Sequence, residues 1–222
     1  MVTPTAATAS HPISPDVTAD LRTAILNGEF APQQRLVEVD LCEQFGASRA
    51  TVRTALLNLS TEGLVERLPN RGARVRAISV EEAIEILEVR LLLESLCARK
   101  LAEIITPEQS LRLTSLRANI VEALDTNNLV EYSALHQQLD AFIREHCGQE
   151  TAAQLLLWLQ AQAARHQFRL SFRPGRAQTS GPEHLAIIDA ITSQDPDAAE
   201  AAIRIHLESV IAALKETQPS LS

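Results

Sequence analysis

Residues 34–77, QRLVEVDLCEQFGASRATVRTALLNLSTEGLVERLPNRGARVRA, predict a helix, a tight turn, a second helix and then a two-stranded wing rich in arginine. This order of elements is typical of a winged helix-turn-helix, for which duplex DNA is the first partner to consider. In the second helix, Arg49 and Arg53 stand one turn apart on one face. The apolar residues follow the helical period and predict a buried face: Ala50, Val52, Ala55, Leu56 and Leu59. A helix with one arginine face and one buried face fits a major groove.

Local turn chemistry supports the same order of elements. Gly46 follows the first helix at a position where a left-handed residue would end it. Ser48 is expected to cap the second helix, and the exposed N-terminus that it leaves suits a phosphate. Two extended runs surround Pro69-Asn70-Arg71-Gly72 and predict a hairpin. Its tip residue, Arg71, could reach a minor groove or the DNA backbone.

Charge is unevenly distributed along the chain, which carries 20 basic and 28 acidic residues and a net charge of −8. Residues 1–77 hold 8 arginines and 8 acidic residues, so the whole excess of acid lies in residues 78–222. Within residues 48–76, six arginines face two glutamates, a local net charge of +4. Screening limits exposed charges to about 8–10 Å at ordinary salt, so a polyanion would respond to this local excess. The alternative is a solvated, arginine-rich winged helix that binds protein.

The run from Ile25 to Val75 resembles the DNA-binding domain of GntR-type bacterial repressors, which share segments of the form SR-x-x-VR-x-AL and EGLV. This resemblance implies a set of DNA contacts. Arg49 and Arg53 would contact operator bases or adjoining phosphates, Ser48 and Thr51 would contact the DNA backbone, Gly72 would mark the wing tip, and Arg35 is a further backbone candidate. The chain departs from the family pattern where Gln33-Gln34 replace the usual glycine turn and where Thr54 replaces a common glutamate.

Length and composition predict two domains in a mainly α protein, a winged helix-turn-helix over residues 15–77 and an all-α bundle over 78–222. Aromatic residues make up only 3% of the chain, which suits helices packed on helices. Residues 1–14 are expected to form a disordered tail and lack the regions of a signal peptide. The sequence contains no run of 18 apolar residues, so no membrane-spanning helix is expected. The three cysteines, odd in number and widely spaced, suggest reduced thiols in a cytoplasmic protein: Cys42, Cys97 and Cys147.

The second domain is expected to be a series of helices. Ser79 and Glu82 form a capping-box pattern before a long helix that would end near residue 105. Thr106-Pro107 then begins another, with proline at the first helical position. Further helices are predicted over 128–147, 150–171, 182–193 and 196–215, with Gly148, Pro174-Gly175, Gly181-Pro182 and Asp195-Pro196 between them.

Four residues of this bundle could hold a divalent metal: His136, Asp140, His184 and His206. His136 and Asp140 are four positions apart and share one helix face. His184 and His206 would lie about 14 and 15 Å from the turn between their antiparallel helices, and therefore level with each other. Three imidazoles and one carboxylate suit zinc, nickel, iron or manganese. Alternatively, the histidines are ordinary surface or core residues, and the i, i+4 pair only stabilises its helix.

ISVEEAIEILEVRLLLESLCARKLAE and GPEHLAIIDAITSQDPDAAEAAIRIHL resemble the start and end of the effector domain of the FadR-type subgroup, the FCD domain. In that subgroup an aspartate and three histidines commonly hold a divalent metal beneath a pocket for a small carboxylate. His184 and His206 match the two later histidines. In one alignment His136 and Asp140 exchange the earlier aspartate and histidine, and in the other Tyr132 takes the place of the aspartate. Arg90 resembles an arginine that faces the effector, although an exposed ion pair with Glu94 is the alternative.

These features together predict a homodimer that binds a palindromic operator and acts as a repressor controlled by a small organic acid. The acid would bind beside the metal and change the relative positions of the two DNA-binding heads. One alternative is a metal-responsive regulator without an organic effector. A metal-dependent enzyme is a further alternative, although no general base stands beside the proposed ligands.

Overall fold

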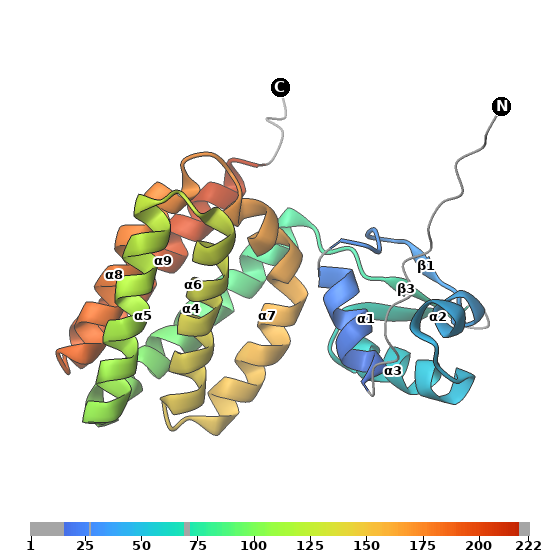
Figure 1. Ribbon diagram of the computed structural model, residues 1–222, viewed down its shortest axis with the longest axis horizontal. Helices are drawn as coiled ribbons and strands as arrows, with labels where there is room; N and C mark the ends of the chain where they lie inside the picture. The colour runs from blue at the N-terminus through green and yellow to red at the C-terminus, as the bar shows by residue number, and fades with distance from the viewer. Residues whose placement is uncertain (1–15, 27, 69–71, 218–222) are drawn as a thin grey trace. The chain divides into compact units, whose positions relative to one another are not determined.

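The computed structural model describes residues 16–26, 28–68 and 72–217, so the expected tail over residues 1–14 lies outside the described residues. The chain divides into two compact units on either side of the bond between Ala77 and Ile78. The first unit combines helices with a small sheet, and the second is built of helices (Figure 1). The fold is therefore mainly α, with an N-terminal winged helix-turn-helix and a C-terminal helical domain.

The first unit contains three helices and a three-stranded antiparallel sheet among its described residues. The helices are α1 (Val17–Leu26), α2 (Glu38–Phe45) and α3 (Arg49–Thr61), and the strands are β1 (Arg35–Leu36), β2 (Val65–Leu68) and β3 (Gly72–Val75). The strand order is β1-β3-β2, with Arg35 opposite Arg74 and Val65 opposite Val75. Helix α1 packs against α3, and strand β1 adds a third strand to the predicted two-stranded wing.

The predicted turn between α2 and α3 is present in detail. Gly46 has a left-handed backbone (φ 61°) and ends α2. The Ser48 hydroxyl accepts a hydrogen bond of 3.1 Å from the backbone N–H of Thr51 and caps α3. Val52 and Leu59 of α3 are fully buried, as the apolar stripe predicts. Ala50 was wrongly included in that stripe, because it lies in the first turn of α3 and is exposed.

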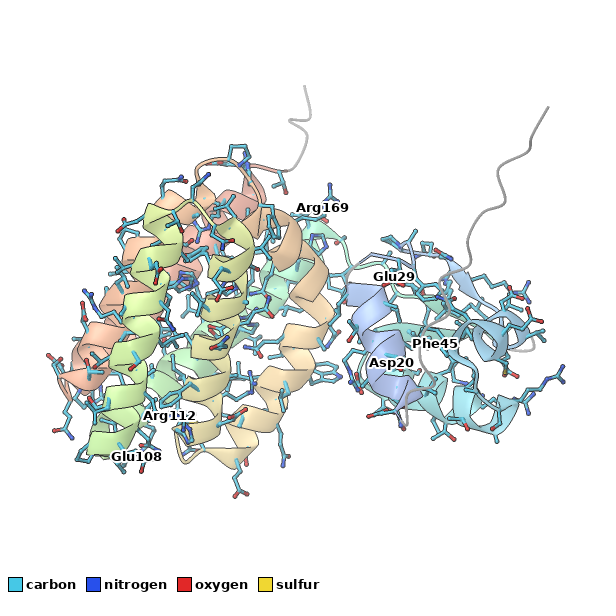
Figure 2. The ribbon with its side chains drawn as sticks, in the orientation of Figure 1. Asp20, Glu29, Phe45, Glu108, Arg112 and Arg169 are labelled. Carbon is cyan, nitrogen blue, oxygen red and sulfur yellow. The ribbon has the colours of Figure 1, made fainter. Side chains whose placement is uncertain are left out.

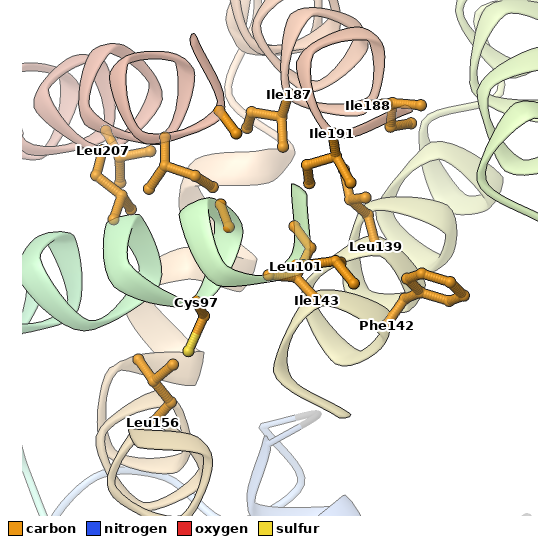
Figure 3. Close-up of a cluster of buried hydrophobic side chains, with 14 of the residues drawn as sticks. Cys97, Leu101, Leu139, Phe142, Ile143, Leu156, Ile187, Ile188, Ile191 and Leu207 are labelled. Atoms are coloured by element: carbon orange, nitrogen blue, oxygen red, sulfur yellow. The ribbon is translucent and has the colours of Figure 1, made fainter. Parts of the chain in front are cut away.

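The second unit consists of six described helices: α4 (Val80–Ile104), α5 (Pro107–Asp125), α6 (Leu129–His146), α7 (Glu150–Ser171), α8 (Arg176–Thr192) and α9 (Pro196–Lys215). Helix α4 is the central one, because it packs against α6, α7, α8 and α9. Figure 3 shows the core around it, where Cys97 of α4 lies beside Leu156 of α7 and Leu101 of α4 lies beside Ile143 of α6. None of the described helices is long and apolar enough to cross a membrane.

Helix α8 begins six residues earlier than predicted, because Gly181-Pro182 lie inside it instead of preceding it. The glycine serves packing. A Cβ at Gly181 would lie 2.6 Å from the Cδ1 atom of Leu124, so its absence allows α8 to approach α5 closely. The left-handed residue that precedes α8 is Gly175, with φ 82°. The earlier start adds Arg176 and Ser180 to the helix that carries His184.

Candidate functional site

The N-terminal unit presents the polar face of α3, which carries both predicted DNA-reading arginines. Arg49 is exposed, and the Arg53 side chain is 68% exposed although its Nε donates to both oxygens of Glu38, at 2.8 and 3.0 Å. An exposed ion pair of this kind contributes only about 0–1 kcal/mol, so Arg53 can leave Glu38 at little cost. At the N-terminus of α3, the hydroxyls of Ser48 and Thr51 lie 2.8 Å apart.

The wing carries further cations. Gly72 begins β3 with a left-handed backbone (φ 84°), which favours glycine there. Arg35 is exposed on β1, while Arg71 lies outside the described residues. Sequence reasoning missed Arg67, an exposed residue near the end of β2. The local excess of positive charge within residues 48–76 is therefore carried by α3 and the wing.

The C-terminal unit contains a cavity of about 40 Å³ among α4, α6, α7, α8 and α9. One water needs roughly 10–15 Å³ of such space, so the cavity suits a molecule of a few non-hydrogen atoms. Among its lining residues are all five side chains predicted for metal and effector: Arg90, His136, Asp140, His184 and His206. Further lining residues are Glu94, Tyr132, Gln167, Leu170, Ser171, Arg176, Ser180 and Val210.

A chain of hydrogen bonds fixes the protonation of His184, which is only 3% exposed. The Ser180 hydroxyl donates to the backbone carbonyl of Arg176 (3.0 Å), so it accepts from the Tyr132 hydroxyl (2.7 Å). The Tyr132 oxygen then accepts from Nδ1–H of His184 (2.9 Å). The opposite nitrogen, Nε2, carries the lone pair and is buried without a hydrogen-bond partner. His184 is therefore oriented like a metal ligand whose other nitrogen is held by a neighbouring group.

Two more histidines lie beside His184. The ring of His136 stacks on it with centroids 5.4 Å apart, and the ring of His206 lies 4.4 Å from it. Burial, together with the electrostatic effect of His206, lowers the pKa of His136 to about 4 and that of His184 well below 6.5. Nδ1 of His136 is buried without a hydrogen bond of standard geometry, and Nδ1 of His206 lies 2.8 Å from the Glu183 carboxylate. Neutral imidazoles with unpaired nitrogens are the form that binds a metal.

The charged groups of the cavity are largely paired with one another. Nε and Nη2 of Arg90 each lie 2.7 Å from the same oxygen of Glu94, and both side chains are buried. Burial raises the pKa of Glu94, Arg90 partly offsets this, and the Asp140 carboxylate raises it again. Burial also raises the pKa of Asp140, with Arg90 acting in the opposite direction. Arg176 contacts Ser209 and Glu183 through separate nitrogens.

The residues present fit a divalent metal by their chemistry, since His136 and His184 line one cavity with Asp140, and Nε2 of His184 is buried without a hydrogen-bond partner. Among the described residues, however, no three His, Cys, Asp or Glu side chains are arranged as a ready-made metal site. Both alignments of the earlier ligand pair remain open, because Tyr132, His136 and Asp140 all line the cavity from α6.

Sequence reasoning missed Glu94 as a buried cavity residue and missed Arg176 altogether. Glu94 was considered only as an exposed partner of Arg90, whereas the pair is almost fully buried. Two other arginines of this domain, Arg144 and Arg169, are not among the residues that line the cavity. Arg144 donates to Gln160, and Arg169 is exposed on α7 (Figure 2).

Comparison with known proteins agrees with both units. A family model described as the FCD domain matches residues 85–209, and one described as bacterial regulatory proteins, gntR family, matches residues 14–75. The chain belongs to the GntR family. It is a DNA-binding transcription regulator of the group that carries an FCD domain, as the sequence resemblance predicted.

Relatives of this GntR regulator cover almost its whole length. The repressor NanR of Klebsiella aerogenes is 31% identical over an alignment of 229 positions that covers 90% of this chain and 84% of that protein. The repressor RspR of Escherichia coli is 24% identical and covers 93% of this chain and 91% of that protein. These relatives are transcription regulators and not enzymes.

Solved structures share the fold of this GntR regulator. McbR/YncC of E. coli superposes with a TM-score of 0.76 at 20% identity, covering 93% of this chain and 98% of that chain. A GntR regulator from Rhodococcus superposes with a TM-score of 0.72 at 22% identity, covering 91% and 97%.

Proposed function

We propose that this regulator represses transcription as a homodimer on a palindromic operator, and that a small organic acid bound beside a divalent metal controls it. The observation that carries this proposal is the cavity of the helical unit, where three histidines and Asp140 line a small free space and Nε2 of His184 has no hydrogen-bond partner. Repression is the proposed sign because RspR and NanR are named repressors. The effector response would follow from preferential binding of the acid to one arrangement of the two heads.

His136, His184, His206 and Asp140 would hold the metal, which would supply a positive centre for an anionic oxygen of the effector. Two hydrogen-bonding neighbours of the histidines, which sequence spacing cannot reveal, support this ligand set. Tyr132 holds Nδ1 of His184, and Glu183 lies beside Nδ1 of His206. Each of these two rings therefore has a partner that orients its opposite nitrogen.

Formal charges of the cavity explain why an acid would need the metal. With neutral histidines, the lining residues Arg90 and Arg176 provide two positive charges, and Glu94 and Asp140 provide two negative charges, so the formal sum is zero. A divalent cation would change the sum to +2, which attracts an anion.

A homodimer is proposed because an operator of two half-sites requires two heads. Helix α4 offers a surface for it. Val89, Leu92 and Leu96 follow one stripe of α4 and are 48%, 63% and 37% exposed. An apolar stripe of this kind on a polar helical domain is typical of a protein–protein contact.

Operator binding by the heads can be tested with two arginine variants. Arg49→Ala and Arg53→Ala should each weaken operator binding by about tenfold or more, because a good base contact contributes about 1–3 kcal/mol. Arg117→Ala removes the same charge from an exposed ion pair with Asp189 in the helical unit and should leave binding unchanged. Gel shifts against a selected promoter fragment, with circular dichroism of each variant, would measure this. Unchanged sequence-specific shifts in both head variants would exclude α3 as the reading helix.

A metal-responsive regulator without an organic effector is the second candidate, and it is favoured by the imidazoles and the carboxylate that line the cavity, a donor set that suits a metal ion by itself. The two candidates differ in one titration. Operator affinity would be measured in protein treated with a chelator, then with Zn²⁺ or Ni²⁺ added, and then with small acids added to the metal-loaded protein. A change at the metal step alone supports the metal sensor. A change only after the acid step supports control by an acid.

A further inference from the structure

Glu94 is a cavity residue to which the proposed metal and acid contacts assign no role. It is 8% exposed, lies one turn after Arg90 on the central helix α4, and lines the same free space as Asp140. Burying a carboxylate costs free energy unless it is paired, and here Arg90 pairs with one of its two oxygens. The other oxygen, Oε2, makes no hydrogen bond with any described residue.

Glu94 changes what Arg90 can offer to a ligand. A free guanidinium binds a carboxylate through two parallel N–H···O bonds. In this cavity Nε and Nη2 of Arg90 are both engaged by Glu94, and Nη1 is buried with no hydrogen-bond partner. The Nε–Nη2 edge of Arg90 is therefore occupied by Glu94, and the donors left for a ligand are the two N–H groups of Nη1 and the second N–H of Nη2.

The groups left at this end of the cavity are thus N–H donors of Arg90, at Nη1 and Nη2, and one acceptor, Oε2 of Glu94. A hydroxyl group matches both kinds, because it donates one hydrogen bond and accepts another. A carboxylate can accept from Arg90, but it cannot donate to Oε2, and its charge would oppose Glu94 and the nearby Asp140. An ammonium group can donate to Oε2, but it cannot accept from Arg90.

We propose that Glu94 makes the cavity selective for a small monocarboxylate that carries a hydroxyl group, and that it discriminates against dicarboxylates. This inference rests on the proposed function, since it assumes that the acid's carboxylate lies toward the histidines. The hydroxyl then donates to Oε2 of Glu94 and accepts from Nη1 of Arg90. The small free space of about 40 Å³ favours short acids over long ones.

Three acids with the same three-carbon chain test this directly: propionate, 3-hydroxypropionate and malonate. Their binding to the full-length protein loaded with Zn²⁺ would be measured by isothermal titration calorimetry. We expect 3-hydroxypropionate to bind at least about tenfold more tightly than malonate or propionate. In Glu94→Gln the amide oxygen still accepts from Arg90, but the free acceptor becomes an N–H donor. Malonate should then gain at least about tenfold relative to 3-hydroxypropionate.

Two further variants control the comparison. Glu88→Gln makes the same charge change at an exposed position of α4 and should keep the wild-type order of the acids. Glu94→Asp keeps the carboxylate and should retain discrimination against malonate, which shows whether any change in Glu94→Gln reflects charge and not general damage. Thermal melts of all variants would accompany the titrations.

The failure of this inference can be separated from the failure of the proposed function. If acids bind and change operator affinity but Glu94→Gln keeps the wild-type order, or if the wild type prefers malonate, only the role of Glu94 is overturned. If none of the three acids binds the Zn²⁺-loaded protein, the role of Glu94 is overturned. If, in addition, no acid alters operator affinity, the proposed control by an organic acid is also overturned.

Discussion

Replacing Tyr132 with phenylalanine tests the hydrogen-bond chain that orients His184. The change removes one hydroxyl and leaves Nδ1–H of His184, a residue 3% exposed, without its acceptor. A buried donor that loses its partner costs about 1–3 kcal/mol. Ser180 keeps its bond to the Arg176 carbonyl, so the loss falls mainly on His184. We therefore expect the free energy of unfolding of the metal-free protein to fall by about 1–3 kcal/mol.

The same substitution should weaken metal binding. Loss of a group that holds a metal-binding histidine typically reduces metal affinity by about 10–100-fold. Urea unfolding in EDTA would measure the first effect, and competition between the protein and a chelator for Zn²⁺ would measure the second. Ser180→Ala is the matched control, because it removes the next hydroxyl of the chain but leaves His184 bonded to Tyr132, and its effect on Zn²⁺ affinity should be smaller. Unchanged stability in Tyr132→Phe would refute the chain. Lower stability with unchanged Zn²⁺ affinity would refute the assignment of His184 as a ligand.

Two further predictions concern the cap of α3 and the buried histidines. Ser48→Asp keeps a good N-cap and should leave the free energy of unfolding within about 0.5 kcal/mol of the wild type. It also places a negative charge against a DNA phosphate and should weaken operator binding by about tenfold, whereas Ser48→Asn should preserve both properties. Equal operator binding by the two variants would argue against a phosphate at Ser48. In EDTA, the free energy of unfolding should decrease as the pH falls from 6.5 towards about 4, because His136 binds a proton in the unfolded chain but not in the folded protein. The total decrease from this residue is on the order of 3 kcal/mol. Urea unfolding of His136→Gln should show a weaker dependence of stability on pH, since Glu94 and Asp140 act equally in both proteins. Equal slopes of stability against pH in the two proteins would contradict the low pKa of His136.

The helix-turn-helix could be predicted from sequence because its signals are local. Gly46 and Ser48 act within one or two residues of the turn that they form, and both adopt the expected conformation. Helix α1 and strand β1 were missed for different reasons. Leu21 of α1 is buried against α3, more than twenty residues away along the chain, and β1 is only two residues long.

The cavity was predictable only in part. His136 and Asp140 share a face through helix geometry alone, and the short turn between α8 and α9 brings His184 level with His206. Arg176 was missed because α8 begins before Gly181-Pro182, where a sequence pattern suggests a boundary. The burial of Glu94 depends on the four helices that surround α4, and no local pattern contains that information.

Operator affinity of the wild type and of His184→Ala, with Zn²⁺ and a calorimetrically identified acid, tests the central claim most directly. Fluorescence anisotropy with a selected operator fragment would give both dissociation constants. The account predicts that the acid changes the wild-type Kd by at least about tenfold, a coupling of about 1.4 kcal/mol, and leaves the Kd of the variant unchanged. An equal change in both proteins, or no change in the wild type, would contradict control of the DNA-binding heads through this cavity.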